Sequence, residues 1–262
     1  MRTAGRGLVV WIVSALALLM GGCASSSSAP TQPRGQDVNA HDPLGATVLM
    51  QQGQMLVAEG RIADGMAKYQ AVVKMQPKNP TIHNLIGQAE LWRGDAAKAV
   101  DSFNRALALA PTYSDARNNR GVAYAQLGQY AMAESDYLAV LADTTYANRA
   151  GVYLNLGVLY FGRGNLGAAE ENLRRAATAS GPVDAYFLLG QVEEKLGKPA
   201  LAESALREAA TRAPERPDIA LALGRLLEGQ GRTDEARKIY VRILEVAPNS
   251  PEAAQVRPKV SR

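Results

Sequence analysis

The sequence has a single cysteine, few large aromatic side chains and little net charge. One cysteine cannot form a disulfide within the chain, so the fold depends on packing alone. Only three Phe and two Trp occur in 262 residues, while Ala, Leu and Gly are abundant. That balance favours close-packed helices over β-sheets, whose strands prefer β-branched and aromatic residues. The formal net charge of +4 is small and scattered, which argues against a nucleic-acid-binding surface.

Groups that catalysis or metal binding requires are equally scarce. The two histidines are His41 and His83, and no Cys or His residues have a spacing that suits a metal ion. The sequence has no G-x-S-x-G motif and no phosphate-binding glycine loop. His83 is expected to pack in the fold or line a groove rather than act as a general base. We therefore expect no catalytic residue, no metal, no cofactor and no small-molecule substrate.

The N-terminal segment has the pattern of an export signal. Arg2 and Arg6 precede an apolar run over residues 8–20, and two glycines then lead to Cys23. The run is shorter than the roughly 20 residues of a transmembrane helix, but it is typical of a secretory signal. The arrangement resembles the lipobox of bacterial lipoproteins, with Met20 where that pattern prefers Leu. An ordinary secretory signal with an incidental cysteine is the alternative.

The lipobox resemblance implies that residues 1–22 are a signal peptide and that Cys23 is lipidated and becomes the first mature residue. The next residue is Ala24 rather than Asp. By resemblance to lipoprotein sorting in Gram-negative cells, this implies the outer membrane, with the protein facing the periplasm. Residues 23–45 are rich in Ser, Pro, Gly, Gln and Asn and offer little to bury, which predicts a flexible tether.

Beyond residue 45 the sequence repeats itself six times. Three small-residue positions recur in phase, with spacings of 33 to 36 residues between copies. They are Gly53, Gly87, Gly121, Gly157, Gly190 and Gly224; Gly60, Gly94, Gly128, Gly164, Gly197 and Gly231; and Gly65, Ala99, Ala133, Ala169, Ala202 and Ala236. Apolar residues at helical spacing flank each glycine pair, which predicts two amphipathic helices joined by a tight turn. The first glycine of each repeat lies inside the first predicted helix, where glycine lowers helix stability relative to alanine. Its recurrence indicates that another helix packs too close to this position for a side chain.

This pattern resembles the tetratricopeptide repeat (TPR). The resemblance implies an all-α fold, a right-handed superhelical solenoid of six helical hairpins with a concave face. The predicted repeats are 46–79, 80–113, 114–149, 150–182, 183–216 and 217–250, and residues 251–262 form a C-terminal cap or tail. Repeat three departs from the pattern, because its final segment lacks the usual proline and carries two extra residues.

Asparagines predict a binding surface in the groove. In the TPR register the fifth and sixth positions of each first helix face the concave side, where Asn84, Asn118, Asn119 and Asn155 lie, with Gln88 nearby. Amide side chains both donate and accept hydrogen bonds, so they suit an extended peptide backbone. The alternative is a polar face that is merely solvated.

Tyrosines concentrate in repeats three and four. The repeat pattern explains some of them as core residues, but it leaves Tyr146 and Tyr153 unexplained. Tyrosine is enriched in the buried centres of protein interfaces. We therefore include both in the predicted partner-binding set.

The connection between repeats three and four carries a more specific resemblance. Asn118 and Asn119 before a glycine-containing helix, the connection from Asp143 to Tyr146, and residues 155–157 resemble the middle repeats of the type IV pilus pilotins, including the social gliding motility lipoprotein. The resemblance implies a non-enzymatic scaffold that binds the pilus secretin and promotes its localisation and multimerisation. Pilus assembly and twitching or gliding motility would depend on it.

Other functions remain open at this stage. A TPR lipoprotein also suits an adaptor for tight-adherence pili or for peptidoglycan and other envelope enzymes. A hydrolase or transferase is the third class, and the scarcity of catalytic groups disfavours it.

Overall fold

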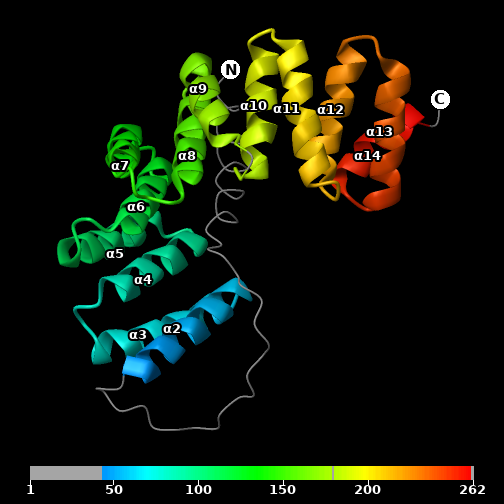
Figure 1. Cartoon of the computed structure of the whole chain (residues 1–262). Coiled ribbons are helices and arrows are strands. Elements are labelled where there is room, and N and C mark those ends of the chain that lie inside the picture. Colours follow the sequence, from blue (N-terminus) through cyan, green and yellow to red (C-terminus); the bar gives the residue numbers. More distant parts are fainter. Residues whose placement is uncertain (1–42, 179, 261–262) are drawn as a thin grey trace. The chain divides into compact units, whose positions relative to one another are not determined.

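The computed structural model describes residues 43–178 and 180–260, and within these ranges it contains thirteen helices and no strand (Figure 1). The all-α class predicted from the sequence is therefore confirmed. Cys23, the predicted signal peptide and most of the predicted tether lie outside the described residues. Of the helices described, none is both long enough and apolar enough to cross a membrane.

Twelve of these helices pair in chain order as six hairpins, and one more follows. The pairs are α2 (Pro43–Ala58) with α3 (Ile62–Met75), α4 (Pro80–Trp92) with α5 (Ala96–Leu109), α6 (Ser114–Gln126) with α7 (Tyr130–Ala142), α8 (Arg149–Gly162) with α9 (Leu166–Ala176), α10 (Val183–Lys195) with α11 (Pro199–Arg212), and α12 (Pro217–Gly229) with α13 (Thr233–Val246); α14 (Pro251–Val260) is single. α2 begins three residues before the first predicted repeat, so it includes the end of the segment predicted as a tether.

The hairpins belong to two units. The first unit ends at Ala147 and its described part holds α2 to α7, while the second begins at Asn148 and holds α8 to α14. In each unit the two helices of a hairpin run antiparallel (Figure 1). Each unit therefore stacks its own hairpins on one another.

The second glycine of each repeat forms the hairpin turn. These glycines, Gly60, Gly94, Gly128, Gly164, Gly197 and Gly231, have φ angles between +70° and +85°. Among residues 43–178 and 180–260 no other residue has a positive φ angle. Glycine suits this position because it reaches left-handed φ without the steric penalty of a Cβ atom.

The first glycine of each repeat lies against a large side chain of the second helix. A Cβ atom added to Gly121 would come within 2.6 Å of the Tyr137 ring, and one added to Gly157 within 2.5 Å of Leu173. The close neighbour that the sequence predicts is thus a packed side chain of the partner helix. Tyr137 and Leu173 are fully buried at these contacts.

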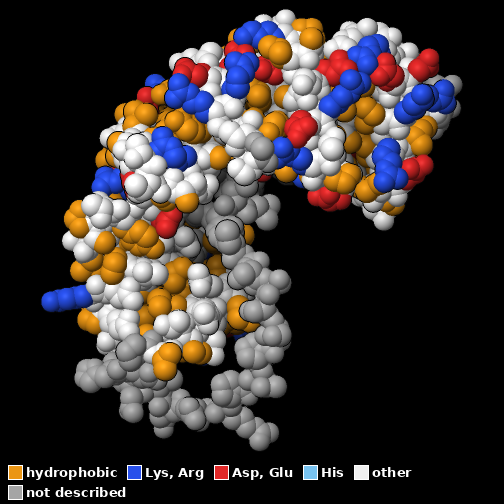
Figure 2. Space-filling view, viewed as in Figure 1, with side chains coloured by type: hydrophobic (Ala, Val, Ile, Leu, Met, Phe, Trp, Pro, Cys, Tyr) orange, Lys and Arg blue, Asp and Glu red, His pale blue; other side chains and the backbone are white. Residues whose placement is uncertain are grey.

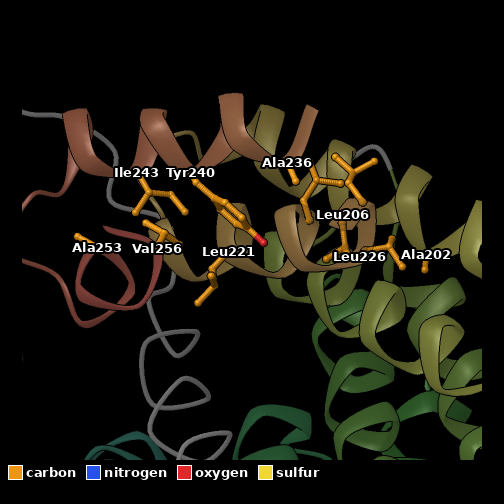
Figure 3. Packing of buried hydrophobic residues seen from close by; sticks show 11 residues of the cluster. Ala202, Leu206, Leu221, Leu226, Ala236, Tyr240, Ile243, Ala253 and Val256 are labelled. Carbon is orange, nitrogen blue, oxygen red and sulfur yellow. The ribbon is translucent and has the colours of Figure 1, made fainter. Parts of the chain in front are cut away.

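Each unit is held by apolar layers between helices. In the second unit the layer contains Tyr240 and Ile243 of α13, Leu221 of α12, and Ala253 and Val256 of α14 (Figure 3). Burial of such side chains stabilises a fold by about 1.5–3 kcal/mol each. α14 therefore packs against the last hairpin of its unit.

Charged side chains also join successive hairpins of the second unit. Glu170 of α9 accepts hydrogen bonds from Lys198 Nζ at 2.8 and 2.7 Å, and Lys198 directly follows a turn glycine of the next hairpin. One repeat later, Glu203 of α11 accepts bonds of 2.8 and 2.7 Å from Arg232 Nη1. These donors hold the pKa values of both carboxyl groups below their usual range.

Alanine at the first glycine is expected to destabilise the hairpin. In Gly121→Ala the new methyl group collides with the Tyr137 ring, so we expect the free energy of unfolding to fall by about 1–3 kcal/mol. Gly167→Ala in α9 is the matched control, because no atom lies within 4 Å of its added Cβ. There we expect no loss and a gain of up to about 1 kcal/mol. Urea unfolding of both variants measures the difference, and equal effects would contradict the contact.

The carboxylate of Glu170 is expected to contribute stability only above its pKa. Its folded pKa is lowered, so its contribution is present above the unfolded value of about 4.3 and is lost as the pH falls through the folded value. Glu170→Gln should lower stability at pH 7 by less than about 1 kcal/mol, and the difference from wild type should vanish in acid. Thermal melts between pH 3 and 7 test this, with the exposed Glu171→Gln as control. A difference that is constant over pH would refute it.

Candidate functional site

Two asparagines meet between neighbouring hairpins of the first unit. Asn84 lies on α4 and Asn119 on α6, and each is only 4% exposed. Asn119 Nδ2 donates a hydrogen bond to Asn84 Oδ1 at 3.0 Å. Asn84 Nδ2 in turn donates to the phenol oxygen of Tyr113 at 3.3 Å. Side-chain amides therefore link the first helices of repeats two and three.

Two further residues extend this contact toward the connection after α7. Asp115, in the first turn of α6, accepts a hydrogen bond from the Tyr146 hydroxyl at 2.7 Å. Burial raises the pKa values of Tyr113 and Tyr146, and the neighbouring Asp115 carboxylate raises both values further. Both phenols therefore stay protonated at neutral pH. We call Asn84, Asn119, Tyr113, Asp115 and Tyr146 the asparagine–tyrosine cluster.

The irregular connection before α8 is fastened to the start of α6. Asp143 accepts hydrogen bonds from the Thr145 backbone N–H at 3.0 Å and from its hydroxyl at 2.6 Å. The other carboxylate oxygen of Asp143 accepts a bond from Ser114 at 3.1 Å. With the hydrogen bond from Tyr146 to Asp115 included, most polar side chains of the connection are hydrogen-bonded. The two extra residues of repeat three thus form an ordered, hydrogen-bonded segment.

The structure brings together three of the seven residues predicted to bind a partner, namely Asn84, Asn119 and Tyr146. Gln88 and Asn118 belong to the same unit and are half-buried. Tyr153 and Asn155 belong to the second unit. Asn155 is buried there, and the guanidinium groups of Arg149 and Arg175 lie over the Tyr153 ring, 6.0 and 5.5 Å from its centroid. Cation–π contacts of this kind fix the ring in place.

The hydrogen bonds of the cluster decide what it does chemically. The Asn84 carbonyl and amide and the Asn119 amide each make a hydrogen bond within the protein, and both side chains are almost wholly buried, so a bound peptide has little access to them. Buried amides that satisfy one another hold neighbouring helices in register. The cluster is therefore primarily a structural link, with its tyrosines at the half-buried margin.

No candidate metal site emerges from the part of the chain that the structure describes. Residues 43–178 and 180–260 contain no group of three or more His, Cys, Asp or Glu side chains arranged to hold a metal ion. His83 is buried, and its Nε2 lies 3.0 Å from the carbonyl oxygen of Pro77. This placement agrees with the packing role expected for it.

Sequence reasoning missed two members of the cluster. Tyr113 was one tyrosine among several and Asp115 was not considered. Both flank the start of α6, where an acidic residue is favourable because it faces the positive end of the helix dipole. The sequence signal for this contact was an acidic residue at the start of a predicted first helix, Asp115, followed 31 residues later by Tyr146 in the irregular connection.

Removal of the central asparagine is expected to break both hydrogen bonds that it makes in the cluster. In Asn84→Ala the Asn119 amide and the Tyr113 hydroxyl each lose a bond, so we expect a loss of about 1–3 kcal/mol in the free energy of unfolding. The half-buried Gln88→Ala, one turn along the same helix, should change it by less than about 0.5 kcal/mol. Chemical denaturation compares the two. If Asn84→Ala is as mild as Gln88→Ala, the link is not structural.

Family models for the tetratricopeptide repeat match most of the described chain. One matches residues 50–114 and 154–217, a second matches 102–135, and a third matches 195–259. Each is described as "Tetratricopeptide repeat". Both structural units therefore contain matched segments.

Solved structures with similar folds include PilW, PilF and YrrB. PilW, described as a widely conserved type IV pilus biogenesis factor, has a TM-score of 0.72 at 21% identity, covering 82% of this chain and 99% of that chain. PilF of Pseudomonas aeruginosa has a TM-score of 0.70 at 16% identity, covering 82% and 98%. YrrB, a TPR protein with an unusual peptide-binding site, has a TM-score of 0.54 at 14% identity, covering 72% and 97%.

At these identities the structural similarity establishes the fold rather than the function. The matched repeat models and the helical hairpins with their glycine turns agree with each other. The chain belongs to the tetratricopeptide-repeat family.

Proposed function

We propose that the protein is a lipid-anchored scaffold of a type IV pilus system. In this role it binds the pilus secretin at the outer membrane and promotes its localisation and multimerisation, without catalysing a reaction. The similarity in fold to PilW, which extends over nearly all of PilW, is the observation that carries the proposal. The lipobox-like segment ending at Cys23 supports the anchored form.

Anchoring is central to how such a scaffold acts. A lipid on Cys23 would hold the protein at the membrane, and each buried CH₂ of the acyl chains would contribute about 0.8 kcal/mol. From Cys23 to the start of α2 the chain has a composition typical of flexible linkers, and a flexible linker of that length would span about 25 Å. Confinement to the membrane raises the local concentration of scaffold and secretin, so a modest affinity is sufficient for assembly.

The repeat units themselves supply the binding surface. Stacked hairpins expose faces of several helices at once, and TPR proteins use such faces to bind other proteins. In the first unit two of the four amides predicted to bind a peptide, Asn84 and Asn119, are engaged in the asparagine–tyrosine cluster. Secretin binding in this proposal therefore uses side chains other than Asn84 and Asn119.

Deletion of the gene, with a Cys23→Ala strain alongside, tests the proposal. We expect both strains to lose detergent-resistant secretin multimers while the amount of secretin monomer stays normal. Ser25→Ala, two residues from the proposed lipid site, is the matched control and should retain the multimers. Electrophoresis of membrane extracts and secretin immunoblotting provide the measurement.

Normal multimers in both the deletion and the Cys23→Ala strain would refute the secretin role. A defect in cell shape or detergent resistance in the deletion strain would then favour an adaptor for envelope enzymes. Loss of multimers on deletion alone would support secretin binding and refute the need for the anchor.

A further inference from the structure

Four positions of each second helix lie mostly on its solvent side. They are the positions 11, 14, 17 and 18 residues after the first glycine of the repeat. Their occupants are Lys98, Asp101, Asn104 and Arg105 in α5, and Met132, Ser135, Leu138 and Ala139 in α7. All of these residues are exposed. The two helices therefore offer the same surface with different chemistry.

α7 is the exception among the described second helices, because each of the others carries a charge at one or more of these positions. The charged occupants are Asp64 in α3, Lys98, Asp101 and Arg105 in α5, Glu171, Arg174 and Arg175 in α9, Arg207 and Glu208 in α11, and Glu235, Lys238 and Arg242 in α13. The hairpin fold thus tolerates charge at every one of these positions. The apolar residues that α7 has there are not a requirement of the fold.

The exposed side of α7 carries no charge. The helix has two acidic residues and no Lys or Arg. Glu134 is half-buried, and Asp136 is buried and bonded to Arg120 at 2.7 Å. Met132 and Leu138, by contrast, are 49% and 51% exposed. The side of α7 that meets solvent is therefore its less polar side.

Five exposed residues of α7 make up what we call the charge-free face, namely Ala131, Met132, Ser135, Leu138 and Ala139. They lie on one side of the helix, because they are spaced by three or four residues along it. In the view of Figure 2 the part of the chain around α5 to α7 shows more hydrophobic and fewer charged side chains than α10 to α13. A helix that is apolar on all sides is typically covered on all sides. The charge-free face thus has the composition of a surface that an assembly buries.

The charge-free face has the same pattern in both directions from Ser135. Met132 and Leu138 lie three residues to either side of Ser135, and Ala131 and Ala139 lie four residues to either side. In an antiparallel pair of α7 helices with a two-fold axis at Ser135, Met132 of one copy lies against Leu138 of the other. The alanines meet in the same way. A closed two-fold dimer requires such a self-complementary patch.

The absence of charge also favours a second copy as the occupant. A two-fold axis brings a residue close to its own counterpart, so a charge near the axis faces a like charge, which is costly. The same pairing through α5 would bring Asp101 against Asp101 of the second copy, because Asp101 holds the repeat position of Ser135. In α7 the position holds a hydroxyl group, which both donates and accepts hydrogen bonds and can pair with itself.

Two other occupants are less well matched. A lipid surface is expected to attract a helix with Lys or Arg beside its apolar stripe, and α7 has neither. A different protein would place no demand for two-fold symmetry on the pattern of residues around Ser135. One helix face is smaller than the roughly 800 Å² per partner of a standard interface, so the self-association is weak.

We propose that the protein self-associates through the charge-free face of α7, with two copies pairing antiparallel about a two-fold axis at Ser135. Met132 and Leu138 of each copy supply the apolar contact, and Ser135 lies at its centre. The inference goes beyond the proposed function, since it holds whether or not the protein binds the secretin.

A cysteine at the axis tests the pairing in the full-length protein. Ser135→Cys places two thiols beside each other across the axis, and Asp101→Cys is the matched control at the same repeat position of α5. Wild type, with Cys23 as its one cysteine, gives the background. Membranes from cells that make each variant are treated with copper phenanthroline, and non-reducing electrophoresis measures the disulfide-linked dimer.

We expect at least fivefold more dimer from Ser135→Cys than from Asp101→Cys or wild type. Equal amounts from the two variants, or no dimer, overturn the proposal. Crosslinks from Ser135→Cys to other proteins in place of the dimer overturn it too and make a different protein the occupant. The substitution changes one atom of an exposed side chain, so this test does not depend on the charged variants described next.

A charge exchange tests the antiparallel register. Met132→Lys and Leu138→Glu should each weaken self-association of the purified full-length protein at least tenfold, from a Kd on the order of 10–100 μM. The double variant brings each new lysine against a glutamate of the other copy, so its Kd should return to within about threefold of wild type. Lys98→Glu, at the counterpart of Met132 in α5, is the control and should leave the Kd within twofold.

Sedimentation velocity over a range of concentrations in mild detergent measures these constants. No recovery in the double variant overturns the antiparallel pairing, and so does equal weakening by Lys98→Glu. Peroxide oxidation of Met132, read by mass spectrometry, should slow as the wild-type concentration rises through the Kd. If oxidation slows only in lipid vesicles and not with concentration, a lipid surface is the occupant and the proposal is overturned.

Discussion

In every hairpin a glycine of the first helix lies against a large side chain of the second. The side chain is the ring of Tyr69, Phe103, Tyr137 or Tyr240, or the branched end of Leu173 or Leu206. A single methyl group at the glycine would place atoms closer than van der Waals contact permits. The absence of a Cβ atom is thus the constraint that brings the two helices together and buries the ring.

The contacts between hairpins depend on that closure. Once the second helix lies flat against the first, its outer apolar residues form the surface on which the next first helix packs, as Tyr69 and Val72 receive Ile82. Polar contacts are added where the apolar ones leave room. The polar contacts between successive hairpins differ between the two units. The first unit uses amides and tyrosines, and the second uses Glu–Lys and Glu–Arg hydrogen bonds.

The same construction leaves the first and the last described helix in different surroundings. A stack of hairpins has two ends, and each end needs either a cap or a partner. α14 covers the C-terminal end with Ala253 and Val256, while α2 leaves Val48 and Met55 exposed.

The repeat period, the hairpin turns and the helix pairs follow from the sequence alone. They depend on local chemistry, because only glycine tolerates the turn conformation at Gly128 and only glycine leaves space beside Tyr137. The lipid site at Cys23 likewise rests on local sequence and stays a prediction, outside the described residues.

The roles of single side chains do not follow from the sequence. Asn84 and Asn119 are 35 residues apart and meet only after the hairpins stack. Val48 and Ile82 have the same kind of side chain at the same repeat position, and only the presence of a preceding helix makes one exposed and the other buried. Burial and hydrogen bonding belong to neighbours in space, so the tertiary structure alone decided them.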